Sequence, residues 1–226
     1  YNVLEQPFAA IYLATKELAR MAEMTAAMIV ETKKAFLGND LETAHKVIET
    51  DLIINNLRDK IVKYLSSIFP VETVTEHQSV TISGLMHVVS DIEHIGDNCK
   101  DIANFAVDKI AKGYSFSDSA CAEIYQCFDH SSKMVSGSIE ALNTGNTLLA
   151  RHVKEQQEEM ADMEEHLREK HMRRLNKKQC SPEFSVVYTD IVNDLKKIGD
   201  NCDNIANAVL KDINFRAIKD DGEKHS

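Results

Sequence analysis

The sequence predicts an all-α protein built as two tandem three-helix bundles, with six long helices in total. Turn-forming residues are scarce, since the 226-residue chain contains only eight Gly and three Pro, whereas a β-sandwich or an α/β enzyme needs many more turns. Apolar residues recur at steps of three and four through six long segments, which is the spacing of one helix face. A motif in the third segment returns in the sixth, which indicates an internal repeat.

The first half contains three predicted helices. The first spans residues 8–37, and Gly38 stands where a C-terminal capping glycine is expected. Asp40 can cap the second helix, whose apolar stripe covers residues 44–65 and ends before a proline. The third helix, over residues 82–110, alternates apolar steps of three and four, so it presents one continuous apolar seam to its neighbours.

The second half repeats this order, with predicted helices over residues 117–142, 147–178 and 183–218. Its middle helix begins acidic and ends basic, with the cations gathered between Lys170 and Lys178. That order suits the helix dipole, which favours negative charge in the first turn and positive charge in the last. A basic patch that faces a membrane is the alternative interpretation, and the sequence leaves both open.

The internal repeat is visible residue by residue. Residues 91–104 read DIEHIGDNCKDIAN and residues 194–207 read DLKKIGDNCDNIAN, so nine of fourteen positions are identical at an offset of 103. Each copy lies in the third helix of its half, and shared helical composition does not produce that much identity. We therefore expect a first three-helix repeat over residues 1–115 and a second over residues 116–226, which together bury more apolar surface than either does alone.

Small residues recur at matching places in the two copies. Gly96 and Gly199 occupy one position, and Cys99 and Cys202 follow three residues later. Glycine inside a helix costs roughly 1 kcal/mol relative to alanine. A glycine at the same place in both copies therefore predicts a close approach of helices there.

The overall charge restricts the class of partner. The chain has 26 Lys and Arg against 36 Asp and Glu, for a formal net charge of −10, so we expect no nucleic-acid partner, which would need a basic face. The five Cys are odd in number and form no C-x-x-C pair, which indicates reduced thiols in the cytosol. No apolar run approaches the roughly 18 residues that a membrane helix needs, so we expect this segment itself to be soluble.

Carboxylates in the repeated segment form the candidate site. Helical spacing puts Glu93 and Asp97 one turn apart on the stripe beside the seam. One interpretation is a solvated helix face, with Lys100 as a nearby counter-charge. The other is an oxygen-rich site for iron, manganese or zinc, completed by acidic residues of the second helix. In the first half, that helix offers Asp51 and Asn55.

The second half has a weaker set of candidate ligands. Asp200 corresponds to the aspartate of the first copy, and the second helix of this half offers Glu158 and Asp162. Lys196 stands where the first copy has its glutamate, so Asp200 lacks a carboxylate partner one turn earlier. We therefore expect one partial metal site at most, and no cofactor is certain.

Catalytic chemistry finds no support in the sequence. A ferritin-like di-iron oxidase needs two Glu-x-x-His motifs on separate helices, and this chain has one convincing example, Glu42-x-x-His45. No Gly-rich loop follows a strand, and no G-x-S-x-G occurs. We therefore expect no enzyme activity.

The repeated segment resembles the signature of the PhoU family, D-L-E-R-I-G-D-x-x-x-N-I-A. The first copy keeps Asp91, Glu93, Ile95, Gly96, Asp97, Ile102 and Ala103, and the second keeps Asp194, Ile198, Gly199, Asp200, Asn204, Ile205 and Ala206. His94 and Lys196 depart from the signature, and the family's Q-P-x-x-x-D-L-R before the third helix is missing from both halves. The resemblance implies a regulatory module rather than a catalyst. It also implies metal ligands at Glu93 and Asp97, with second-helix partners at Asp51 and Asn55, then Glu158 and Asp162.

Two further stretches resemble the region that follows the membrane domain in bacterial sodium/phosphate cotransporters, which carry a cytosolic PhoU-like domain. These stretches are residues 7–21, PFAAIYLATKELARM, and residues 167–180, LREKHMRRLNKKQC. The matching residues are Pro7, Glu17, Met21, Arg168, His171, Arg174, Leu175 and Cys180. A chain that begins at Tyr1 without Met fits such a domain.

The resemblance implies the soluble cytosolic regulatory domain of a sodium-dependent phosphate cotransporter, at the cytoplasmic face of the inner membrane. Its partner would be a membrane transporter domain upstream of Tyr1 in the same chain, or a regulatory protein, and a homodimer is a further candidate. The alternative is a free-standing PhoU-type negative regulator of phosphate uptake and signalling that binds metal. That alternative predicts an initiator Met directly before this segment and a complex with an ABC ATPase or a sensor kinase.

Overall fold

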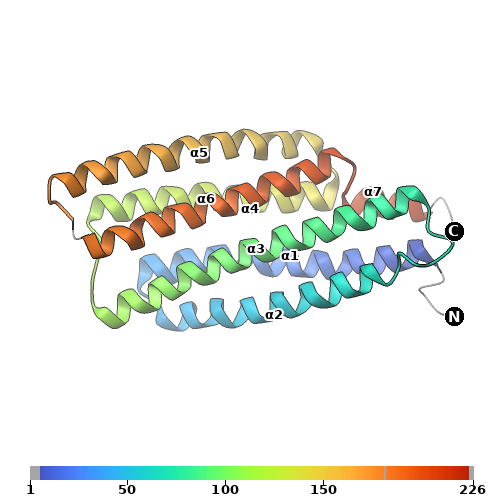
Figure 1. Cartoon of the computed structure of the whole chain (residues 1–226), viewed down its shortest axis with the longest axis horizontal. Coiled ribbons are helices and arrows are strands. Elements are labelled where there is room, and N and C mark those ends of the chain that lie inside the picture. The colour runs from blue at the N-terminus through green and yellow to red at the C-terminus, as the bar shows by residue number, and fades with distance from the viewer. Residues whose placement is uncertain (1–5, 181, 224–226) are drawn as a thin grey trace.

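A computed structural model describes residues 6–180 and 182–223 of the chain, and this part is helical without a strand (Figure 1). Six long helices and one short helix follow one another, which confirms the predicted fold class. They are α1 (Pro7–Gly38), α2 (Leu41–Ser66), α3 (Glu76–Lys112), α4 (Asp118–Thr144), α5 (Thr147–Asn176), α6 (Pro182–Leu210) and the short α7 (Phe215–Glu223).

The helices form two three-helix units that lie side by side along the long axis (Figure 1). In each unit, all three helices contact one another. The units meet where α3 packs against α6 and where α1 packs against α4. Helices α3 and α6 run in opposite directions (Figure 1), so the two copies of the repeated motif pass each other at the centre of the molecule.

Side-chain caps begin each helix from α2 to α5. Asp40 accepts a hydrogen bond from the Thr43 amide at 3.0 Å, and Asn146 does the same for α5. Thr75 and Gln78 form a reciprocal capping box at the start of α3, and Ser117 caps α4. These side chains satisfy amide groups that have no partner within the helix.

The helix ends differ from the sequence prediction in one respect. Gly38 is the last residue of α1, and the left-handed conformation falls on Asn39, with φ of 54°. Asparagine tolerates that conformation because its short polar side chain makes local hydrogen bonds. Gly113 and Gly145 take the left-handed position after α3 and α4, as capping glycines do.

Apolar residues of both units form one continuous core. The seam of α3 is buried along its length, including Ile82, Val89 and Ile92. The largest fully buried side chains come from both units, with Phe36 on α1, Phe128 on α4 and Tyr188 on α6. The units therefore share their interior rather than touching through a polar surface.

The last predicted helix, over residues 183–218, is broken in the structure. Helix α6 ends at Leu210, Asp212 adopts φ of 61°, and the side chain of Asn214 then caps α7 by accepting from the Ala217 amide at 2.8 Å. Ile213 lies in the break and is buried, so the apolar pattern of the sequence runs on without interruption. Periodicity alone does not reveal such a turn. The turn predicted around Cys180 and Pro182 includes Ser181, which lies outside the described residues.

Candidate functional site

The two copies of the repeated motif form a shallow groove between α3 and α6. Asn204 of α6 donates a hydrogen bond to Asp91 of α3 at 2.9 Å, which links the two helices across it. The groove is lined by His94, Asp97, Asn98, Asp101, Lys197, Asp200 and Asn201. Six of these residues are matched pairs at the offset of 103, so the two halves contribute equivalent positions to one surface.

Three predicted carboxylates come together in the first unit, each with a cationic partner. Asp51 of α2 is only 1% exposed and Glu93 of α3 is 5% exposed. The Lys100 ammonium lies 2.5 Å from Asp97 Oδ1 and 3.5 Å from Asp51 Oδ2. Arg58 of α2 donates to Glu93 Oε1 at 3.2 Å. Two cations of the chain itself therefore accompany the three carboxylates, with Lys100 shared between Asp51 and Asp97.

Burial shapes the electrostatics of this cluster. Burial raises the pKa of Asp51, the positive charge of Lys100 opposes that rise, and Asp97 adds to it. Burial also opposes the charge on Lys100, but the hydrogen bond to Asp97 and the charge of Asp51 outweigh it and raise the pKa of Lys100. Two buried oxygens, Asp51 Oδ1 and Asn55 Oδ1, accept no hydrogen bond. The buried face of α2 thus has two oxygen atoms that could each accept a further hydrogen bond.

The second unit neutralises its motif differently. Asp200 Oδ2 is 2.7 Å from the Lys196 ammonium, and its other oxygen accepts a short hydrogen bond from Gln157 of α5. Lys154 of α5 lies 3.0 Å from Asp203. In the first unit, Lys100 of the third helix contacts Asp51 of the second helix. In the second unit the lysine is on the second helix, and it contacts an aspartate of the third.

Two of the predicted ligands are not part of this second cluster. Glu158 and Asp162 are exposed on α5, and the α5 residue that meets Asp200 is Gln157. The helix caps explain why. Asp51 lies eleven residues after its cap Asp40, and Gln157 lies eleven residues after its cap Asn146. Counting from the capping residues would have identified Gln157 in the sequence.

Metal binding at Asp51, Glu93 and Asp97 stays a prediction, and the structure adds a condition to it. Within the described residues, no group of three or more His, Cys, Asp or Glu side chains is placed so that it could hold a metal ion. The donor set suits a hard cation, and the unused Asp51 Oδ1 fits such a ligand. Lys100 stands between Asp51 and Asp97, so iron, manganese or zinc would have to displace its ammonium.

A second buried polar cluster joins α4, α5 and α6. Glu123 of α4 is buried and accepts two hydrogen bonds from Arg174, at 2.9 and 2.8 Å. Lys170 lies 2.7 Å from the same carboxylate, and the Tyr188 hydroxyl donates to it at 2.6 Å. Burial opposes ionisation, but these three donors outweigh it and lower the pKa of Glu123 to about 2. Helix periodicity does not predict this cluster, because Glu123 and Tyr188 lie on α4 and α6, far in sequence from Lys170 and Arg174 of α5; the resemblance of residues 167–180 to the cotransporters names Arg174 but not its partners.

His171 belongs to the same cluster and is held neutral. Its Nε2 lies 2.6 Å from Ser185 Oγ, its Nδ1 lies 3.4 Å from Arg174 Nη2, and its ring stacks on Tyr188. A guanidinium can only donate, so Nδ1 accepts and Nε2 carries the hydrogen that Ser185 receives. Burial, and then the charge of Arg174, lower the pKa of His171. Because its Nδ1 faces a cation rather than a carboxylate, His171 is not oriented to activate the serine.

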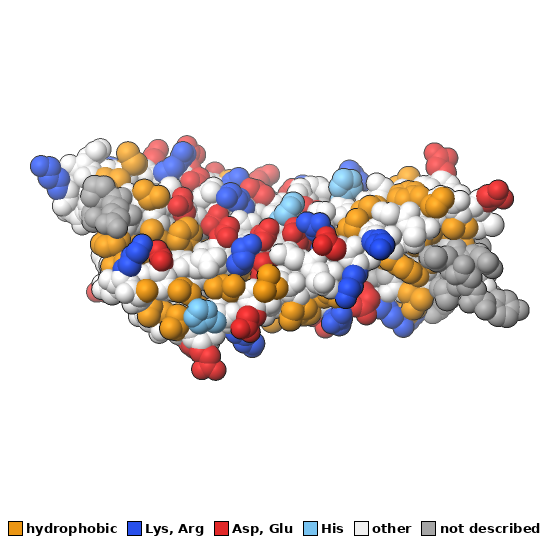
Figure 2. Space-filling model, turned by 60° about the horizontal axis from the view of Figure 1, so that its bottom comes forward, with side chains coloured by type: hydrophobic (Ala, Val, Ile, Leu, Met, Phe, Trp, Pro, Cys, Tyr) orange, Lys and Arg blue, Asp and Glu red, His pale blue; other side chains and the backbone are white. Residues whose placement is uncertain are grey.

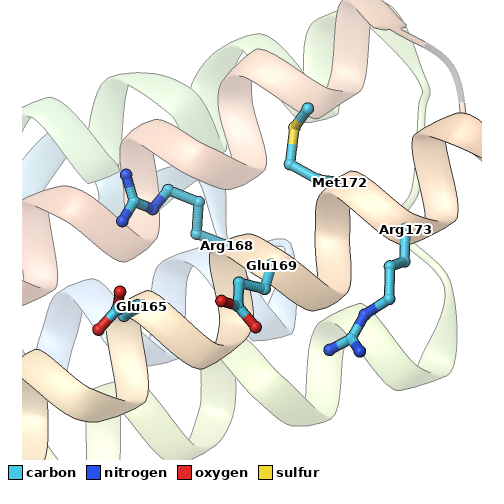
Figure 3. Close-up of a pocket in the computed structure, with 5 residues that line it drawn as sticks. All are labelled: Glu165, Arg168, Glu169, Met172 and Arg173. Atoms are coloured by element: carbon cyan, nitrogen blue, oxygen red, sulfur yellow. The ribbon is translucent and has the colours of Figure 1, made fainter.

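A surface hollow lies along the C-terminal half of α5. Its lining residues, Glu165, Arg168, Glu169, Met172 and Arg173, all come from α5 (Figure 3). Ligand pockets usually form where side chains of several elements converge. A hollow lined by one helix is therefore a surface feature and not an enclosed site.

Acidic and basic side chains are interspersed over much of the face in Figure 2.

The fold and its paired central motifs define a helical-bundle protein made of two like units. The chain belongs to the PhoU domain family, whose match covers residues 18–106 and 124–209. Each matched segment begins in the first helix of its unit and ends in the third, within or just beyond the repeated motif. In the described residues, no helix is long and apolar enough to cross a membrane.

Similar proteins agree with this assignment. The phosphate-specific transport system accessory protein PhoU homolog 1 of Thermotoga maritima is 25% identical over 167 residues, which cover 74% of this chain and 71% of that protein. The crystal structure of PhoU from Pseudomonas aeruginosa has a TM-score of 0.84 at 20% identity, over 89% of this chain and 96% of that one. The phosphate transport system regulatory protein PhoU from Streptococcus pneumoniae has a TM-score of 0.76 at 17% identity, over 88% and 93%. These two structures establish the shared fold.

Replacing Gly96 or Gly199 with alanine should affect the stability of the protein differently. A Cβ atom on Gly96 would meet Ile54 at 3.6 Å, an ordinary contact, whereas one on Gly199 would lie 2.5 Å from Gln157 Oε1 and 3.3 Å from Met134 Sδ. We expect Gly96→Ala to leave stability unchanged or to raise it by up to about 1 kcal/mol through helix propensity. Gly199→Ala should be less stable than Gly96→Ala, because the Gln157 side chain must shift and its hydrogen bond to Asp200 is disturbed. Urea unfolding of both variants checks this, and equal effects would contradict it.

Removal of Lys100 tests the condition on metal binding. We expect Lys100→Gln to take up manganese or zinc more tightly than the native chain, because the substitution removes the cation that lies between Asp51 and Asp97. Lys196→Gln is the matched control, since Asp200 has no second carboxylate on the facing helix. Elemental mass spectrometry after dialysis against each metal measures the uptake. Equal metal content in the two variants would refute the prediction.

The Glu123 cluster predicts a pH dependence of stability. The pKa of Glu123 falls from 4.5 to about 2 on folding, so its contribution is complete above pH 4.5 and is lost as the pH falls from there towards 2. We expect native protein to lose about 2 kcal/mol more between pH 5 and pH 3 than Glu123→Gln does. Urea midpoints at both pH values measure the difference, with Glu158→Gln, an exposed site, as control. If Glu123→Gln and native protein lose stability in parallel, the carboxylate is not ionised as described.

Proposed function

We propose that this chain is a regulatory module of phosphate transport that acts by presenting its helical surface to a transporter or to a signalling partner. The observation that carries the proposal is the central groove, to which both units contribute the same positions of the family motif. The Thermotoga maritima relative is described as an accessory protein of a phosphate-specific transport system, and the Streptococcus pneumoniae structure as a phosphate transport system regulatory protein. Both descriptions support a role in the same process.

The reactive groups of the described chain favour recognition over catalysis. Burial raises the pKa of the Cys99, Cys127 and Cys202 thiols to about 12, so none of them is a thiolate nucleophile near neutral pH. The buried Ser185 receives a hydrogen bond from a histidine that is not set up as a base. The motif carboxylates Glu93, Asp97 and Asp200 are paired with arginine or lysine. A contact surface is therefore the function that these side chains support best.

Within this role, we propose that the chain is the cytosolic domain of a sodium-dependent phosphate cotransporter, at the cytoplasmic face of the membrane. Support comes from the stretch 167–180, which resembles the region after the membrane domain in such cotransporters. Two residues that carry this resemblance, His171 and Arg174, form the buried cluster around Glu123, so they have a structural reason to be kept. The absence of the Q-P-x-x-x-D-L-R stretch speaks against a free-standing regulator that works with an ABC transporter.

Phosphate uptake by cells tests both levels of the proposal. The experiment removes residues 1–226 from the full gene product and measures radiolabelled phosphate uptake with and without sodium, beside expression of a phosphate-starvation reporter. A cotransporter domain predicts altered sodium-dependent uptake. A free-standing regulator predicts a derepressed reporter and altered uptake that does not depend on sodium. Unchanged uptake together with an unchanged reporter would overturn the regulatory role itself.

A further inference from the structure

The end of α5 is a protruding, positively charged tip on a negatively charged protein. The turn between α5 and α6 lies at the end of the long axis opposite both termini (Figure 1). Between Arg168 and Lys178 the chain has six Lys or Arg and one Glu, although the whole chain has a net charge of −10. No segment of eleven residues elsewhere in the chain has so large an excess of positive charge. We call residues 168–178 the basic tip.

Some cations of the basic tip form ion pairs with the body of the protein, and others are exposed to solvent. Lys170 and Arg174 are bound to the buried Glu123, which anchors the last turns of α5. Arg173, Lys177 and Lys178 are exposed and form no ion pair with another described residue. The anchoring of two cations thus leaves three others pointing to solvent at a rigid helix end.

The helix dipole accounts for only a part of this charge. Its effect falls off within the last turn of a helix, which here contains Arg173 and Arg174. Arg168 lies two turns before the end, where Glu164 is its ion-pair partner at 3.6 Å. Lys177 and Lys178 follow the last helical residue, and Lys178 has a left-handed conformation with φ of 55°. The charge excess therefore extends past the region that the dipole stabilises, and a binding role explains the remainder.

Apolar side chains are exposed beside these cations. Met172 is 51% exposed and Val186 is 60% exposed, and each directly follows a partner in the His171–Ser185 hydrogen bond. In Figure 3, Met172 and Arg173 extend from different sides of α5, away from each other. Unpaired cations around exposed apolar groups suit the interface of a lipid bilayer, where charges meet headgroups and apolar atoms lie at the acyl boundary.

We propose that the basic tip docks the bundle end-on to an anionic lipid bilayer. The orientation follows from the charges along α5, since its preceding turns carry Glu158, Asp162 and Glu165, which an anionic surface repels. Only the tip can approach such a surface closely. The proposal goes beyond the role in phosphate transport and holds for either form of that role, because it depends on the charge and shape of the chain alone.

Vesicle sedimentation tests the proposal with the purified chain. The probes are vesicles of phosphatidylcholine alone and vesicles of phosphatidylcholine mixed with phosphatidylglycerol. We expect native protein to bind only the anionic vesicles and to dissociate as sodium chloride is raised. Arg173→Glu/Lys177→Glu/Lys178→Glu should weaken binding by at least about tenfold. Circular dichroism and thermal unfolding verify that this variant is folded, which is expected because none of the three side chains forms an ion pair with another described residue.

A matched control changes the same number of charges at the other end of the molecule. Lys16→Glu/Lys60→Glu/Lys63→Glu alters exposed lysines near the start of α1 and the end of α2, and should bind nearly as native protein does. Inorganic phosphate should compete no better than chloride at equal ionic strength, since the tip is a protruding surface and not a phosphate pocket. Absent binding to anionic vesicles, equal binding to neutral ones, or equal loss in both triple variants would overturn the proposal, as would selective competition by phosphate.

Discussion

The antiparallel packing of α3 against α6 is the constraint on which the rest of the structure depends. Each helix has one buried apolar seam, and the seam residues Cys99 and Cys202 are fully buried. Because the repeated motif lies where these two helices face each other, this packing brings its two copies into one groove. The same packing merges the interiors of the units, so that neither unit has a complete polar surface of its own. Motif, groove and shared core are consequences of one helix pair.

Burial of the motif creates a charge problem that the units solve in opposite ways. A buried carboxylate is costly unless a cation or hydrogen-bond donors accompany it. The first unit places Lys100 on its third helix beside Asp51 of its second, and the second unit places Lys154 on its second helix beside Asp203 of its third. The lysine is thus on the third helix in the first unit and on the second helix in the second unit. Both units have an ion pair between these two helices. Divergence between the repeats is therefore concentrated in the polar partners rather than in the seam.

Much of the fold followed from the sequence, because helix periodicity and capping residues are local signals. They predicted six long helices and the convergence of Asp51, Glu93 and Asp97. Three features escaped prediction for physical reasons. The turn between α6 and α7 does not interrupt the apolar pattern, because Ile213 within it is buried. The connections between second and third helices differ in length, so the motif offset of 103 does not apply to the second helices, and Gln157 was missed. The cluster around Glu123 joins side chains distant in sequence, which only the packed structure brings together.

The central claim is that the two repeats form one cooperative body through the α3–α6 interface. Differential scanning calorimetry of the purified chain tests this claim most directly, since independent units would melt separately. A shared core predicts a single transition whose calorimetric enthalpy equals its van't Hoff enthalpy. Two resolved transitions, or a calorimetric enthalpy about twice the van't Hoff value, would mean that each unit folds alone, and would contradict the account.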